Sequence, residues 1–139
     1  MKDRFKFRVF DYDKNKMVYF SDLFSVVKPH HDRSSMPNYY NDYKYHKTGE
    51  YMQSTGLKDK NGKLIYEGDV LKVVGKQTEE IIGCVQWLDD FCKFSLNIAN
   101  KKEGKYQSCE IFCEFDYLPE TEREIIGNIY ENKELLGVE

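Results

Sequence analysis

Apolar and polar side chains alternate with a period of two along much of the chain, and this alternation predicts a series of short β-strands. The first strand carries Phe5, Phe7 and Val9 on one side. Its other side carries Lys6 and Arg8, so we expect a half-buried strand with one solvated face. Further strands are predicted over residues 17–20, 70–74, 81–88, 92–98, 108–115 and 124–130.

Two turn signals lie close together in the middle of the chain, and each is followed by an apolar run. The dipeptide Asn61-Gly62 favours a hairpin closed by a type I′ turn, in which both central residues have positive φ. A second bend is predicted at Glu67, Gly68 and Asp69. Gly68 can adopt φ values that other residues avoid, and the Asp69 side chain is expected to bond to its own downstream backbone. The architecture is therefore expected to centre on this stretch.

Short strands separated by turn signals, with no long amphipathic helix, predict a mainly β fold built as a small barrel. The order of Gly, Asp and Val residues after the central hairpin also fits the opening strands of an SH3-like barrel. We expect residues 1–27 to form an N-terminal β-hairpin segment that packs on the main domain. Residues 28–50 are predicted to form a long irregular arm rich in Tyr and His, and residues 51–139 the β-barrel core domain.

Two single residues carry local predictions within these strands. Gly83 interrupts an apolar strand, where a glycine allows either a bulge or the close approach of another backbone. Asn132 is expected to cap a short helical turn near the C-terminus that holds Leu135 and Leu136.

Charge and composition indicate a globular protein without a phosphate-binding stripe. The net charge is −3, but residues 1–50 carry 10 Lys and Arg against 7 Asp and Glu, whereas residues 101–139 carry 5 against 10. This asymmetry suits head-to-tail or partner contacts. Charged residues interrupt the N-terminus where a signal peptide would be apolar, and no run is long enough to span a membrane. We therefore expect a cytoplasmic protein with reduced thiols.

The four cysteines, Cys84, Cys92, Cys109 and Cys113, are the first candidate site. A zinc site favours closely spaced pairs, and these spacings fit that requirement poorly. The strand pattern places Cys92, Cys109 and Cys113 on apolar faces, where cysteine behaves as a small hydrophobic residue. Buried free thiols are therefore the favoured interpretation, with zinc binding as the alternative.

A tyrosine-rich stretch in the arm is the second candidate site. Its tyrosines are interleaved with basic residues, so they could stack on unpaired bases while the cations meet phosphates. The alternative is that they pack the arm onto its own domain or onto a sister subunit. The residues of this candidate binding site are Tyr39, Tyr40, Tyr43, Lys44, Tyr45, His46 and Lys47.

Catalytic and metal sites find weaker support. His30, His31 and Asp32, together with His46, could bind a metal in a hydrolase, but solvated histidines in a loop are the simpler interpretation. The carboxylate pairs Glu67/Asp69 and Asp89/Asp90 are read as turn residues. The sequence has no phosphate-binding loop, nucleophile elbow or zinc-protease helix motif. We therefore expect no catalytic residue, no metal and no cofactor.

Three segments together resemble the YopX family of phage and prophage proteins. They are residues 55–69 (TGLKDKNGKLIYEGD), residues 124–132 (EIIGNIYEN), and the opening residues 6–11 (KFRVFD) followed by Lys16-Met17. Residues 23–50 carry little of the family pattern. The resemblance implies a mainly β, barrel-like domain and an origin in a phage genome, and it supplies no catalytic residue or cofactor.

The function expected from these observations is that of a non-enzymatic binding module. It would be a phage accessory protein that self-associates and acts through contacts with an unknown protein partner, without a membrane. Single-stranded nucleic-acid binding through the tyrosine-rich arm is the alternative, and the overall negative charge makes it the less favoured one.

Overall fold

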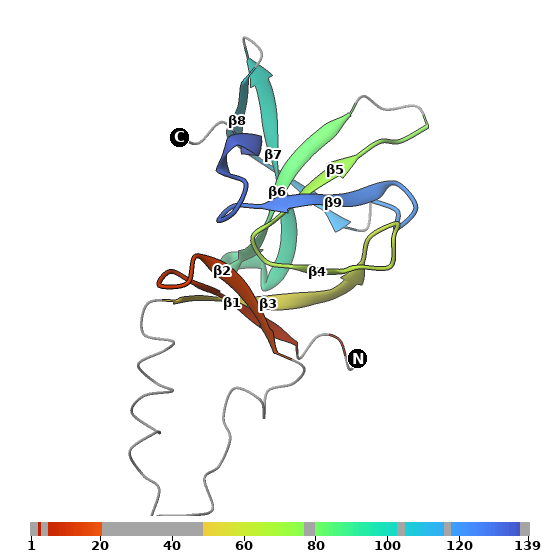
Figure 1. Cartoon of the computed structure of the whole chain (residues 1–139). Helices are drawn as coiled ribbons and strands as arrows, with labels where there is room; N and C mark the ends of the chain where they lie inside the picture. Colours follow the sequence, from red (N-terminus) through yellow and green to blue (C-terminus); the bar gives the residue numbers. More distant parts are fainter. Residues whose placement is uncertain are drawn as a thin grey trace, which may run out of the picture.

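Nine strands in two antiparallel sheets form most of the described chain in the computed structural model (Figure 1). The structure describes residues 3, 6–20, 49–76, 80–102, 105–115 and 118–136, without the side chains of residues 20, 49 and 100–112. The strands are β1 (Phe7–Asp11), β2 (Lys16–Phe20), β3 (Gly49–Lys58), β4 (Leu64–Tyr66), β5 (Asp69–Val73), β6 (Ile81–Leu88), β7 (Lys93–Lys102), β8 (Lys105–Glu114) and β9 (Arg123–Asn128). Two short 3-10 turns are η3 (Asp89–Phe91) and η5 (Lys133–Leu136).

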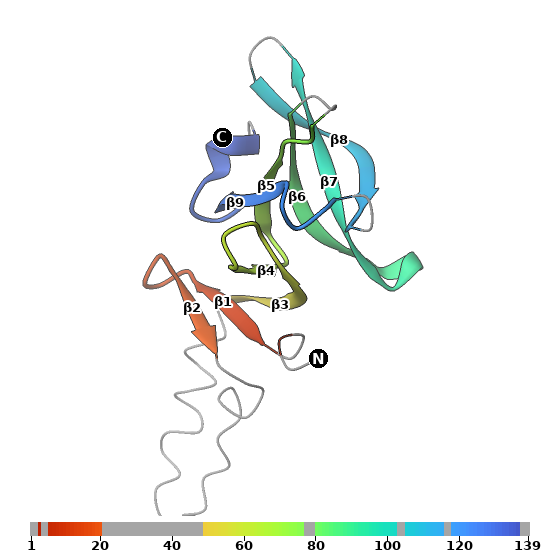
Figure 2. The same cartoon turned by 90° about the vertical axis from the view of Figure 1, so that its right-hand side faces the viewer.

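The larger sheet has the order β8-β7-β6-β5-β9 and curls into a half-barrel (Figure 2). The turn η5, which follows β9, contacts β8 at the opposite edge of the same sheet. The curl therefore brings the two edges of the sheet toward each other. This architecture confirms the prediction of a mainly β fold. The predicted barrel is present as a curled half-barrel sheet, with a second sheet beside it.

Aliphatic side chains from successive strands fill the concave side of the half-barrel. Leu71 of β5, Val85 of β6 and Leu96 of β7 are fully buried there. Removing each such side chain from water stabilises the folded state by roughly 1.5–3 kcal/mol, before the cost in conformational entropy is subtracted. Ile65 of β4 belongs to the same cluster, so the second sheet shares this core.

The smaller sheet has the order β2-β1-β3-β4. The predicted N-terminal hairpin is present, and it joins the sheet through pairing of β1 with β3. β3 begins at Gly49, so the last two residues of the predicted arm lie in a strand. The rest of that arm falls outside the described residues.

The hairpin of β3 and β4 confirms the central prediction, but its turn type differs from the expected type I′. Gly62 has a φ of 79°, whereas Asn61 has no positive φ. The Gly62 N–H donates to the Asp59 carbonyl at 3.0 Å, and the Asp59 N–H donates to the Lys63 carbonyl at 2.8 Å. This longer loop forms because the Asp59 carboxylate accepts the N–H groups of Asn61 and Lys63, both at 2.9 Å.

Gly68 and Gly83 have the backbone roles that their positions predict. Gly68 has a φ of 83° in the tight turn between β4 and β5. At Gly83 the structure selects close approach over a bulge, because an added Cβ would lie 2.6 Å from the Asn97 carbonyl oxygen of β7. The pairing of β6 with β7 keeps a regular register through this position.

The C-terminal segment differs from its predicted form in two details. β9 ends at Asn128, two residues earlier than expected, because the Asn128 side chain accepts the N–H groups of Tyr130 and Glu131 and turns the chain. The Asn132 side chain accepts the Asn128 N–H at 3.2 Å instead of capping η5. The backbone carbonyl of Asn132 accepts the Leu135 N–H and so starts that turn.

Candidate binding cleft between the sheets

A cleft of about 250 Å³ lies where the two sheets meet. Its lining comes from the start of β3, the turn between β4 and β5, the second half of β6, and the two residues after β9. Met52, Cys84 and Val85 are buried, whereas Tyr51 and Trp87 are 43% and 40% exposed. The lining residues are Glu50, Tyr51, Met52, Glu67, Gly68, Cys84, Val85, Gln86, Trp87, Ile129 and Tyr130.

The turn between β4 and β5 holds the cleft together through backbone hydrogen bonds to three other elements. The Glu67 N–H donates to the Gln53 carbonyl of β3, and the Gly68 N–H donates to the Val85 carbonyl of β6, both at 2.9 Å. The Gly68 carbonyl accepts the Ile129 N–H at 3.0 Å. Glu67 and Gly68 are therefore fixed between both sheets and the C-terminal turn.

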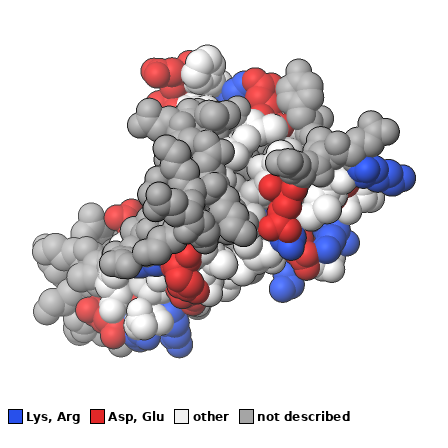
Figure 3. Space-filling model, turned by 90° about the horizontal axis from the view of Figure 1, so that it is seen from above, with Lys and Arg blue, Asp and Glu red and all other residues white. Residues whose placement is uncertain are grey.

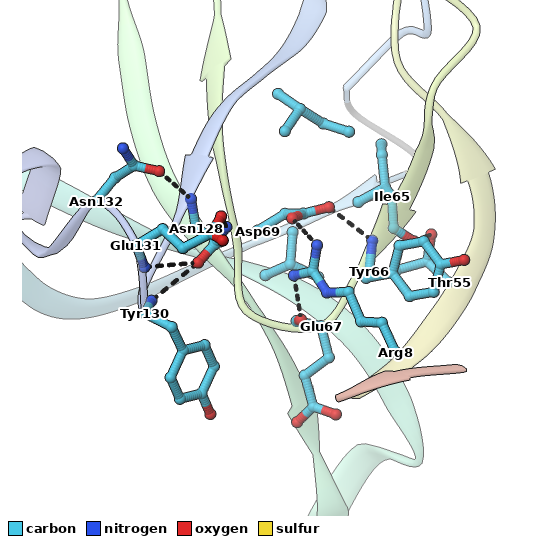
Figure 4. Close-up of polar contacts among 12 residues, drawn as sticks. Arg8, Thr55, Ile65, Tyr66, Glu67, Asp69, Asn128, Tyr130, Glu131 and Asn132 are labelled. Carbon is cyan, nitrogen blue, oxygen red and sulfur yellow. Dashed lines mark hydrogen bonds and ion pairs between the residues drawn. The ribbon is translucent and has the colours of Figure 1, made fainter. Parts of the chain in front are cut away.

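An ion pair between Arg8 of β1 and Asp69 of β5 links the two sheets beside this turn (Figure 4). The Arg8 Nη1 lies 2.6 Å from Asp69 Oδ1, and both side chains are 3% exposed. Arg8 Nη2 donates to the Glu67 carbonyl at 3.0 Å, and Asp69 Oδ2 accepts the Tyr66 N–H at 2.8 Å. Burial raises the pKa of Asp69, although the Arg8 charge and the Tyr66 N–H act in the opposite direction.

This pair corrects two sequence predictions. Arg8 was expected on the solvated face of its strand, yet it is buried because Asp69 neutralises its charge. Asp69 was expected to bond to downstream backbone, but its side chain bonds to Tyr66 and Arg8, which precede it in sequence. Period-two alternation cannot reveal such a pair because its two members are distant along the chain.

Glu67 is the half-buried carboxylate of the cleft. Burial raises the pKa of Glu67, and the negative charges of Asp89 and Glu50 raise it further. The backbone N–H groups of Gln53 and Trp87 lower it, which places the carboxylate between β3 and β6. Figure 4 shows the Glu67 side chain extending to the same side of the turn as the Tyr130 ring.

The Tyr130 ring lines the cleft, and two further aromatic rings outside the lining pack against it. The Tyr130 ring stacks on Phe10 with centroids 5.0 Å apart, and Tyr12 meets both rings edge-on. Burial, with the neighbouring Glu50 charge, raises the pKa of Tyr130 to about 12. Tyr130 therefore stays protonated at neutral pH, so its hydroxyl can donate a hydrogen bond.

The rim beyond Trp87 is also aromatic and acidic. The Trp87 ring meets the Phe94 ring edge-on, with the ring centroids 4.9 Å apart. The 3-10 turn η3 follows in the chain and contains Asp89, Asp90 and the exposed Phe91. Aromatic side chains beside carboxylates suit the recognition of another protein, because large rings contribute contact area at a small entropic cost.

The cysteines occupy different environments from one another. Cys84 is buried in the cleft as predicted, and burial raises the pKa of its thiol to about 12, which leaves it un-ionised and unreactive. Cys92 was predicted in a strand, but it is exposed and precedes β7 with a φ of 48°, because η3 ends there. Cys113 is half-buried, and the Cys109 side chain lies outside the described residues.

Other predicted sites find no test in the described part of the chain. The tyrosine-rich candidate site from Tyr39 to Lys47, and the histidines of the arm, lie outside it. Within the described residues, no group of three His, Cys, Asp or Glu side chains could hold a metal. On the face shown in Figure 3, the acidic and basic side chains of described residues are interspersed. No helix in the described ranges has the length and apolarity needed to cross a bilayer.

The family model of the YopX protein matches residues 6–137. The chain belongs to the YopX family. The resemblance found in the central and C-terminal motifs is thereby confirmed. The match includes β1, β3, the turn between β4 and β5, and β9, so every element that lines the cleft lies within the family region.

A solved structure shares this fold. The crystal structure of protein EF1440 from Enterococcus faecalis is similar to this YopX-family protein with a TM-score of 0.53 and 26% sequence identity. The similarity covers 94% of this chain and 96% of that one, so the two have comparable extents. No curated protein matches the chain.

The cleft has no counterpart among the sites that the sequence predicts. Glu67 was assigned to a turn, which is correct for its backbone, but the side chain also faces the space between the sheets. For Trp87 and Tyr130 the sequence offered only a weak signal, an aromatic residue close to the end of a predicted strand. What brings them together is the pairing of β5 with β6 and β9, and spacing along the chain does not define it.

Proposed function

We propose that this protein is a non-enzymatic phage or prophage accessory protein that binds other proteins, including further copies of itself, through the inter-sheet cleft. The observation that supports this proposal is the rim of the cleft, where Tyr51, Trp87 and Tyr130 gather around buried apolar side chains. Tryptophan and tyrosine are the residues most enriched at the energetic centres of protein interfaces.

The buried neighbours of the rim add to this support. Arg8 and Asp69 fix the sheets relative to each other, so the binding surface is formed before a partner arrives. A preorganised surface loses little conformational entropy on binding. Burial keeps the Cys84 thiol of the lining un-ionised, so this residue is not a candidate nucleophile.

Sedimentation velocity over a wide concentration range, combined with capture of proteins from a bacterial host lysate, tests the proposal. We expect wild-type protein to self-associate or to retain a specific partner, and Trp87→Ala to weaken that contact at least about tenfold. Tyr19→Ala is the matched control, because Tyr19 is an exposed aromatic of β2 outside the cleft. A monomer at every concentration that captures nothing, or equal effects of the two variants, would overturn the proposal.

A further inference from the structure

We propose that the cleft receives a lysine or arginine side chain from an exposed segment of a partner protein. This inference rests on the proposed function and names the chemistry of the partner. It follows from the charge, the aromatic walls and the size of the cleft.

The charge of the cleft is negative. Its lining contains Glu50 and Glu67, while no lysine, arginine or histidine occurs among the described lining residues. Asp89 lies close enough to Glu67 to raise its pKa. The Arg8 guanidinium contacts this turn, but it is already bound to Asp69 and to the Glu67 carbonyl. Neither Glu50 nor Glu67 forms an ion pair with a described residue.

The walls of the cleft suit the rest of a basic side chain. Lysine and arginine bury their methylene stems against apolar surface, which Met52, Val85 and Ile129 provide here. Their charged groups favour positions over aromatic faces, and Trp87 and Tyr130 line the same space. A carboxylate and an aromatic ring together select a cation over a neutral apolar side chain of similar length.

The size of the cleft limits the occupant. Its volume of about 250 Å³ lies below the roughly 300–1,000 Å³ of typical small-molecule sites. The occupant is therefore one or two side chains of a protein segment. Trp87, which is exposed at the rim, can contact the residues that flank the inserted side chain.

A peptide-binding measurement tests this inference on the full chain. The probes are fluorescein-labelled peptides of sequence Leu-Arg-Leu, a matched peptide with neutral citrulline in place of arginine, and Leu-Glu-Leu. Anisotropy gives the affinity, and the emission of Trp87, the single tryptophan of the chain, reports binding at the rim. We expect the arginine peptide to bind at least about tenfold more tightly than the citrulline peptide and to change the Trp87 emission.

Glu67→Gln removes the charge while keeping the shape of the side chain. We expect it to abolish the preference for arginine over citrulline, whereas Glu120→Gln, an exposed carboxylate outside the cleft, preserves it. Far-UV circular dichroism verifies that each variant is folded. Equal affinity for the arginine and citrulline peptides, or an unchanged preference in Glu67→Gln, would overturn the inference.

The failure of this inference is distinguishable from failure of the proposed function. If the protein self-associates or captures a partner through Trp87 but shows no preference for arginine, the cleft binds a partner of different chemistry. If Trp87→Ala also leaves association unchanged, the proposed function fails with the inference.

Discussion

At the scale of single residues, Asp59 shows how one carboxylate can define a local structure. It is fully buried, and it accepts backbone N–H groups from Asn61 and Lys63 in its own loop and from Ile125 in β9. Burial raises the pKa of Asp59, but these three donors together bring it below the ordinary value. The loop between β3 and β4 and the strand β9 therefore depend on one ionised group.

Replacing Asp59 with alanine is expected to destabilise the protein by roughly 2–4 kcal/mol, because it leaves the backbone N–H groups of Asn61, Lys63 and Ile125 without their acceptor. Urea unfolding at neutral pH measures the change. The folded-state pKa lies below the unfolded value, so the carboxylate stabilises the fold above the unfolded pKa and loses this contribution as the pH falls through the folded one.

The difference between wild type and Asp59→Ala should accordingly shrink on acidification below pH 3.8, the ordinary pKa of aspartate. Asp90→Ala is the control, since Asp90 is exposed and its loss is expected to change stability by less than about 0.5 kcal/mol. A pH-independent difference, or equal effects of the two variants, would contradict this role of Asp59.

Glu67 is expected to behave in the opposite way. Its pKa is raised in the folded state, so its ionisation opposes folding: stability is greatest below the unfolded pKa and is lost as pH rises through the folded one. Glu67→Gln should therefore raise the melting temperature at neutral pH, with no gain well below pH 4.5. Glu134→Gln changes the net charge equally at an exposed position and should leave the melting temperature nearly unchanged. A gain that persists at acidic pH would contradict the explanation.

A stabilising Glu67→Gln would also bear on function. Residues that reduce stability without a structural benefit are frequently retained for binding or catalysis.

The sequence could place Glu67, Gly68 and Asp69 in a turn because Gly and Asp have clear backbone preferences. It could not show that Asp69 is buried against Arg8, since that depends on the pairing of β1 with β3, a contact between segments far apart in the chain.

At the scale of elements, the two sheets are joined through β1, the turn between β4 and β5, and β9. Arg8 contributes the one side chain of β1 that bonds to both Asp69 and Glu67 among the described residues. Its Nε has no partner there, which adds to the cost of burying the guanidinium. The pair thus fixes how the sheets meet more than it stabilises the fold.

A double-mutant cycle at this junction gives a specific result. Arg8→Met alone should cost roughly 3–5 kcal/mol, because it leaves the Asp69 charge buried and unpaired. Arg8→Met combined with Asp69→Asn should cost clearly less than the sum of the two single changes, since the remaining groups are neutral. Urea unfolding measures all four proteins. Additive losses would show that the two side chains act independently and would contradict the ion-pair interpretation.

Strand positions were largely predictable, because alternation and turn residues are local signals. β6 was expected over 81–88 and lies at Ile81–Leu88. Turn geometry was less predictable: Asn61-Gly62 favours a type I′ turn, and the bonds of the Asp59 carboxylate select a different loop. Cys92 also lies outside its expected strand. The residues after β6 form the 3-10 turn η3, and Cys92 ends that turn, so β7 begins one residue later.

At the scale of the whole molecule, the half-barrel and the second sheet meet at a cleft that no single strand contains. Membership of the YopX family and the similarity to protein EF1440 agree with the fold. The proposed function rests on the cleft, which is apolar at its buried side and aromatic and acidic at its rim, and which lies beside the ion pair of Arg8 and Asp69. Such a site is assembled from β3, the turn between β4 and β5, β6 and the segment after β9, so sequence spacing alone could not predict it.

Acrylamide quenching of Trp87 fluorescence, recorded while the mass of the protein is followed across concentration, tests the central claim most directly. Trp87 is the single tryptophan and stands 40% exposed at the rim of the cleft. If copies of the protein associate through the cleft, quenching should fall as the mass rises, and Tyr19→Ala should behave like wild type. A rise in mass with unchanged quenching of Trp87 would place the contact elsewhere and contradict the account.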